Sequence, residues 1–92
     1  MDDPEVRAIA RADALAAKAQ ALVPPEVVVE VRRDARWWVQ LAWVAPHDHA
    51  AATRVVQTLE GAGLVLLSRE AEQDGDLADR LSQGELLEVV ER

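Results

Sequence analysis

The sequence predicts an α+β fold, a two-layer sandwich in which helices cover one face of a mostly antiparallel sheet. Three patterns predict it. Apolar residues recur with helical spacing at residues 3–22 and 48–60, they alternate with period 2 at residues 27–32 and 36–44, and a short apolar run follows at residues 64–69. Strands in this order with helices between them form a sheet with one covered face. The 92 residues suffice for a single domain, which we place at 1–92.

The first helix is predicted over residues 3–22. Asp3 is a suitable N-cap, and Pro4 stands at the first helical position, where its missing N–H is not needed. Pro24-Pro25 ends the helix because proline cannot continue it. The apolar stripe of this helix consists of Val6, Ile9, Ala12, Ala16, Ala19 and Val23.

The two strands at residues 27–32 and 36–44 are predicted to form a hairpin. We place its turn at residues 33–35, because an odd-length turn keeps one face of both strands apolar, whereas a two-residue turn mixes the faces. This register sets Val31 opposite Trp37, and a five-residue loop with the same register is the alternative. We expect the first strand to lie in the middle of the sheet.

The second strand contains every aromatic residue of the chain. Trp37 and Trp43 alternate with Val39 and Leu41 on one face, which we assign to the core. Trp38 points the opposite way, on a face that is neither cleanly polar nor cleanly apolar. Because tryptophan is enriched at interface hot spots, this open face is predicted to be a contact surface. Its residues are Val28, Arg36, Trp38, Gln40, Ala42 and Val44.

A second helix is predicted over residues 48–60, with Asp48 as its N-cap and Gly61 and Gly63 at its end. Its buried stripe is Ala52, Val55, Val56 and Leu59. The strand at residues 64–69 is apolar on both faces until Ser68, which predicts an inner or well-covered strand. We expect this strand to run parallel to the second strand.

The end of the chain is less regular. Residues 76–83 predict a short helix that Asp76 caps and Gly84 ends. The spacing of Leu86, Val89 and Val90 in residues 85–92 fits a helix, whereas the preceding glycine, the valine pair and the short length fit a closing strand. We favour the strand.

Composition excludes several classes of protein. Cysteine is absent, so the chain has no disulfide and no thiolate nucleophile. No apolar run approaches the length of a membrane span, and no signal region precedes the first helix, so we expect a cytoplasmic protein that does not bind membranes. The net charge of −7 argues against a nucleic-acid partner, because phosphate binding requires clustered Lys and Arg.

The excess of negative charge lies in one segment. Residues 70–91 contain eight carboxylates and one arginine, Arg80. Such runs are usually a solvated face. The sharper interpretation is an acidic surface that docks on a basic protein, which makes the segment 70–92 either peripheral or partner-facing. The residues of this surface are Glu70, Glu72, Asp74, Asp76, Asp79, Glu85 and Glu88.

No pattern of catalytic, cofactor-binding or metal-binding residues stands out. Nothing matches a nucleophile elbow, a phosphate loop or a dinucleotide fingerprint. His47-Asp48-His49 has the residue types of a metal site, but Asp48 is needed as a helix cap and no further ligand is fixed by a motif. We therefore expect no enzyme, no cofactor and no metal.

Two functions follow from these patterns. The first is a non-enzymatic protein–protein interaction module that forms a homodimer through the open face around Trp38 or through its C-terminal segment. The alternative is a small acidic regulator or inhibitor, of the antitoxin or immunity-protein type, that binds a basic partner protein through residues 70–91. A metal protein or enzyme that uses His47 and His49 is the third and weakest hypothesis.

Overall fold

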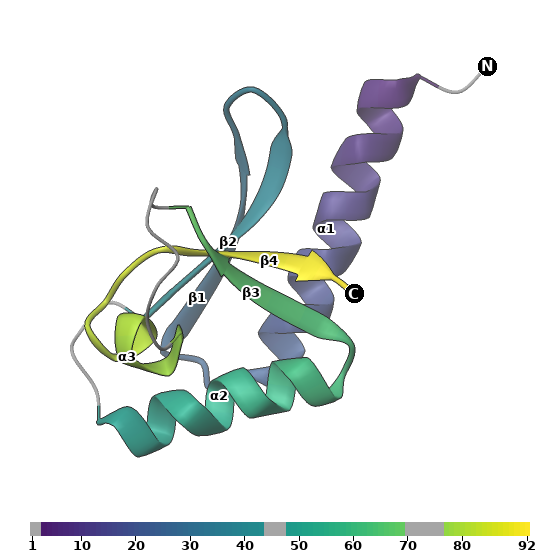
Figure 1. The fold of residues 1–92 in the computed structure, drawn as a ribbon. Helices are drawn as coiled ribbons and strands as arrows, with labels where there is room; N and C mark the ends of the chain where they lie inside the picture. Colours follow the sequence, from purple (N-terminus) through teal and green to yellow (C-terminus); the bar gives the residue numbers. More distant parts are fainter. Residues whose placement is uncertain (1–2, 44–47, 70–76) are drawn as a thin grey trace.

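Figure 1 shows the arrangement of helices and strands in the computed structural model, which describes residues 3–43, 48–69 and 77–92. These residues form one sheet with the strand order β1-β2-β4-β3, in which every neighbouring pair is antiparallel. The predicted α+β class and antiparallel sheet are confirmed. In chain order the elements are α1 (Pro4–Leu22), β1 (Val27–Arg33), β2 (Trp37–Trp43), α2 (His49–Gly61), β3 (Leu64–Ser68), α3 (Leu77–Ser82) and β4 (Leu87–Glu91).

The order of the strands differs from the predicted one. We expected β1 in the middle and β3 as an inner strand, but both lie at edges, and β4 lies between β2 and β3. The cause is the end of the chain, which forms a strand as we favoured. Leu87 and Val89 of β4 pair with Leu41 and Val39 of β2, so β4 takes the place next to β2. β3 keeps the predicted parallel direction relative to β2, because both are antiparallel to β4.

The β1–β2 hairpin has an odd-length loop, as predicted, but the loop comprises residues 34–36 rather than 33–35. Val31 therefore pairs with Val39 instead of Trp37. The apolar faces still coincide, because the register shifts by two residues and side chains alternate with period 2. Asp34 fixes the loop: its Oδ1 accepts a hydrogen bond from the N–H of Arg36 at 3.3 Å, and its own N–H donates to the Arg36 carbonyl at 3.2 Å.

The helix boundaries follow the predicted caps. The Oδ1 atoms of Asp3 and Asp48 each accept a backbone N–H from the first turn of α1 and α2, both at 2.9 Å. Gly63 after α2 and Gly84 after α3 have positive φ angles of 83° and 86°, which glycine adopts without strain. The predicted cap Asp76 lies outside the described residues.

α1 packs along the sheet and also covers part of its edge. The side-chain amide of Gln20 donates to the Val27 carbonyl at 2.8 Å and accepts from the Val29 N–H at 3.1 Å. These backbone groups point outward from an edge strand and would otherwise need another strand or water. The predicted apolar stripe is wrong at its start: Val6 is 61% exposed, because the first turn of α1 projects away from the core.

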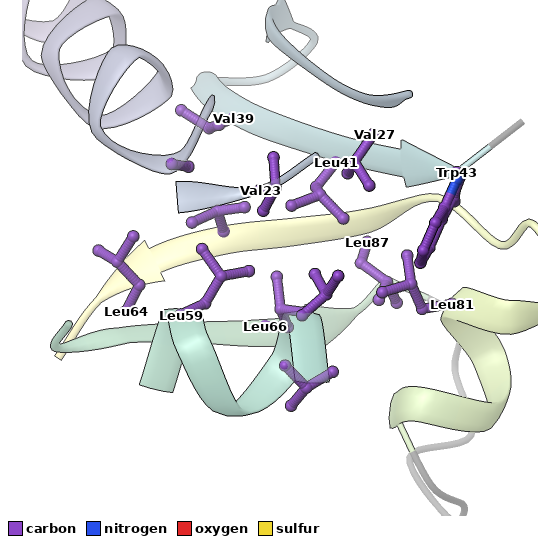
Figure 2. Close-up of a cluster of buried hydrophobic side chains, with 14 of the residues drawn as sticks. Val23, Val27, Val39, Leu41, Trp43, Leu59, Leu64, Leu66, Leu81 and Leu87 are labelled. Carbon is purple, nitrogen blue, oxygen red and sulfur yellow. The ribbon is translucent and has the colours of Figure 1, made fainter. Parts of the chain in front are cut away.

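The core fills the space between the sheet and the helices. Figure 2 shows Leu41, Leu66 and Leu87 of the sheet facing Leu59 of α2 and Leu81 of α3. Each of these five side chains is fully buried, and such burial contributes about 1.5–3 kcal/mol per leucine. The core therefore joins all four strands to the helices on one side of the sheet, and none of the described helices packs on the opposite side.

Candidate interaction surface on the open sheet face

The three tryptophans divide between the two faces of the sheet as predicted. Trp43 is buried in the core and Trp37 packs against it. Trp38 alternates with them along β2 and therefore lies on the face without helices, which we call the open face. The open face is thus built around an aromatic residue.

The ring of Trp38 is covered by an arginine of its own chain. Arg69, directly after β3, places its guanidinium carbon 3.9 Å from the ring centroid. The same guanidinium donates from Nη2 to Oδ2 of Asp34 at 2.7 Å. Partial desolvation raises the pKa of Asp34, but hydrogen bonds from the N–H groups of Arg36 and Ala35 and the charge of Arg69 lower it by more, so the net pKa lies below the ordinary value of 3.8.

Glu88 is a buried carboxylate at the centre of the open face. Its side chain is 6% exposed, and Nη2 of Arg36 lies 2.9 Å from its Oε1 and 2.8 Å from its Oε2. Nη1 of Arg69 is 3.9 Å from Oε1. Arg36 itself stays 59% exposed, so only one member of the pair is withdrawn from water. A buried charge is costly without partners, which explains why two arginines converge on this carboxylate.

The other residues predicted for the interface differ in exposure. Val28 is half-buried, like Trp38, and remains accessible. Gln40 and Ala42 are each only 7% exposed, so they form the floor of the open face and offer a partner little surface. Both residues are covered because β2 is a central strand between β1 and β4. Val44 lies outside the described residues.

Two further strands supply apolar side chains that the sequence did not indicate. In β3, Val65 is half-buried and Leu67 is 41% exposed. In β4, Val90 is half-buried, and Leu86, which directly precedes β4, is exposed. With β1 expected in the middle of the sheet, β3 and β4 were not assigned next to Trp38. The correct strand order brings these residues to the open face.

Charges on the open face cancel in pairs. Among the described residues, the closest ion pairs of this face are Arg32–Glu30 at 3.1 Å, Arg36–Glu88 at 2.8 Å and Arg69–Asp34 at 2.7 Å, and Arg69 also lies 3.9 Å from Glu88. Each joins one cation to one anion. The described residues of the open face therefore carry no net charge, although the whole chain carries a charge of −7.

The three described carboxylates of the predicted acidic surface lie in different surroundings. Glu85 accepts hydrogen bonds from Nη1 of Arg80 and Oγ of Ser68, both at 2.9 Å. Glu88 is buried on the open face, and Asp79 is exposed on α3. The described part of segment 70–92 thus belongs to the sheet and to α3. Four members of the predicted surface lie outside the described residues: Glu70, Glu72, Asp74 and Asp76.

The histidine motif is used for helix capping where the structure describes it. Asp48 caps α2 and His49 is the first residue of that helix, while His47 lies outside the described residues. Within residues 3–43, 48–69 and 77–92, no three side chains of the His, Cys, Asp and Glu types gather closely enough to hold a metal ion.

Comparisons of the chain with protein-family models, with curated proteins and with solved structures found no match. Among the helices of the described segments, none combines the length and the apolar character needed to cross a bilayer.

Proposed function

We propose that this protein is a non-enzymatic, cytoplasmic interaction module that forms a homodimer by packing its open sheet face against that of a second copy. The observation that carries the proposal is that the described residues of this face carry no net charge. Two copies with a charge of −7 repel each other over most of their surfaces. The three ion pairs of the open face remove that repulsion where the copies would meet.

The shape and composition of the open face support the same conclusion. Leu67 and Leu86 are exposed, and Val28, Val65 and Trp38 are half-buried, so a second copy would remove apolar area from water. Arginine and tryptophan side chains are typical of interface centres. Face-to-face packing of two sheets is also a common way to bury such surfaces.

Sedimentation velocity of matched variants tests the proposal. Leu67→Glu puts a charge on the open face at an exposed position, so the fold should tolerate it while the homodimer dissociates. Val6→Glu is the matched control, because Val6 is at least as exposed but lies on α1. We expect a dimer for the wild-type chain and for Val6→Glu, and a monomer for Leu67→Glu. A wild-type chain that stays monomeric up to near-millimolar concentration would refute the proposal.

The dependence on salt separates this proposal from the acidic-regulator alternative. Screening reduces the repulsion between two negatively charged copies, so moderate salt should strengthen the homodimer. Binding of a basic partner through acidic residues should instead weaken as salt rises. Glu85 and Glu88 each form an ion pair with an arginine of the same chain, so among the described residues fewer carboxylates are available to a basic partner.

A further inference from the structure

A groove of about 380 Å³ opens between α1 and the ends of β2 and β4. Figure 1 shows α1 and the β1–β2 hairpin extending past the C-terminal end of β4. The side chains of α1 form one wall and those of the two strands form the other. The lining residues are Ala8, Arg11, Ala12, Leu15, Arg36, Trp37, Trp38, Val39, Glu88, Val89, Val90 and Glu91.

The groove exists because the ladder between β2 and β4 stops early. The last pair is Val39 with Val89, and the same register would next pair Trp37 with Glu91. In an antiparallel ladder, alternate residues turn both backbone polar groups to the same neighbour. Arg92 donates its N–H to Gly63 on the β3 side at 2.8 Å, so Glu91 turns toward β2. The backbone groups of Trp37 and Glu91 therefore face each other without joining.

The groove combines apolar walls with unpaired polar groups. Indole Nε1 atoms of Trp37 and Trp38 are buried and have no hydrogen-bond acceptor within the described residues. On the rim, Arg11 and Glu91 are exposed, and neither has an ion-pair partner among the residues that the structure describes. The other two charged residues that line the groove, Arg36 and the buried Glu88, form an ion pair with each other. Within the described residues, Arg11 and Glu91 thus line the same groove without forming an ion pair with each other or with a third residue.

From this arrangement we propose that the groove binds a free α-amino acid with an apolar side chain. Arg11 suits the carboxylate, Glu91 suits the ammonium group, and the wall of Ala12, Leu15 and Val89 suits the side chain. The volume fits a small molecule. An inserted peptide strand fits less well, because only one residue of each strand is left unpaired. This site does not depend on the homodimer.

The three indole N–H signals of the ¹H–¹⁵N spectrum provide the test. The Leu67→Glu variant serves as background, so that self-association does not contribute. We expect L-leucine or L-phenylalanine to shift the signals of Trp37 and Trp38 and to leave that of Trp43 in place. N-acetyl-leucine lacks the ammonium charge and leucinamide lacks the carboxylate, so each should bind about tenfold more weakly than leucine.

Matched variants assign the rim charges. Arg11→Gln and Glu91→Gln should each weaken leucine binding about tenfold. Lys18→Gln on the same helix and Glu60→Gln on α2 remove equivalent exposed charges outside the groove and should leave binding unchanged. The proposal is overturned if millimolar leucine and phenylalanine shift neither Trp37 nor Trp38. It is also overturned if the Trp43 signal shifts instead. The same holds if both analogues bind as tightly as leucine, or if both rim variants bind leucine as tightly as the protein without these substitutions.

Discussion

Replacing Arg36 by alanine should destabilise the protein more than replacing its buried partner Glu88 by leucine. The side chain of Glu88 is 6% exposed, so without Arg36 its carboxylate stays buried with only the more distant Arg69 to offset the charge. Arg36 is 59% exposed, so without Glu88 its guanidinium is simply hydrated. The asymmetry follows from which partner is left behind.

The structure sets the expected magnitudes. A hydrogen bond to a charged group contributes about 1.5–3 kcal/mol when its loss leaves a buried partner, so Arg36→Ala should cost about 2 kcal/mol. For a domain of this size, that loss lowers Tm by roughly 10 °C. Glu88→Leu should stay within about 1 kcal/mol of the wild type, because no buried charge remains. Arg32→Ala, which breaks an exposed pair on the same face, should cost less than about 1 kcal/mol and serves as the control.

Urea unfolding followed by far-UV circular dichroism measures these differences without relying on the fluorescence of Trp38. Equal m values for all variants confirm that the midpoints report stability. An Arg36→Ala variant as stable as Arg32→Ala would refute the reasoning. So would a Glu88→Leu variant less stable than Arg36→Ala, because the buried carboxylate would then be stabilising in itself.

Three further predictions concern the hairpin and the helix ends. Gly63→Ala should lower the free energy of unfolding by about 1 kcal/mol, because a φ of 83° strains a residue with a side chain. Gly61→Ala in the last turn of α2 should raise it by up to about 1 kcal/mol, because nothing lies within 4 Å of the added methyl group. Equal effects of the two substitutions in chemical unfolding would contradict this. Gln20→Ala should lower the free energy of unfolding by about 1–2 kcal/mol and speed amide exchange at the edge of β1, since two backbone groups lose their hydrogen-bond partner. Unchanged amide exchange would contradict the role of Gln20 in covering this edge. The pKa of Asp34, followed by NMR, should lie below 3.8. The contribution of the ionised carboxylate to stability is then fully present above the pKa of the unfolded state and is lost as the pH falls through the lower pKa of the folded state. Asp34→Asn should therefore be less stable than the wild type at pH 7 and equal to it in strong acid.

Local patterns predicted the elements and the faces of the sheet. The alternation of Trp37, Val39, Leu41 and Trp43 assigned the core face correctly, because side-chain period is a property of the strand alone. Asp3 and Asp48 marked the helix starts for a similar reason, since an N-cap bonds to its own first turn. The hairpin loop begins one residue later than predicted, at Asp34, whose side chain accepts a hydrogen bond from the Arg36 N–H. This bond is also local, but the apolar pattern does not predict it.

Strand order and the chemistry of the open face depend on contacts between distant segments. Alternation in Val89-Val90 indicates a strand but not its neighbour, so the central place of β4 was missed, and with it the side chains of Val65 and Leu67. Arg69 meets Asp34 across 35 positions of the chain, and Arg36 meets Glu88 across 52. Such pairs produce no periodic pattern in the sequence, because any carboxylate can accept a hydrogen bond from any arginine. The groove depends on where a ladder stops, which is likewise a property of two strands together.

A dilution series of ¹H–¹⁵N and methyl spectra tests the proposed homodimer most directly, because each face of the sheet carries its own reporters. On dilution from near-millimolar to low micromolar concentration, the Trp38 indole and the Leu67 methyl signals should move together along one dissociation curve. The Trp43 indole, buried beneath the helices, should stay in place. Spectra that do not change with concentration, or changes confined to Trp43 and the helices, would contradict packing through the open face.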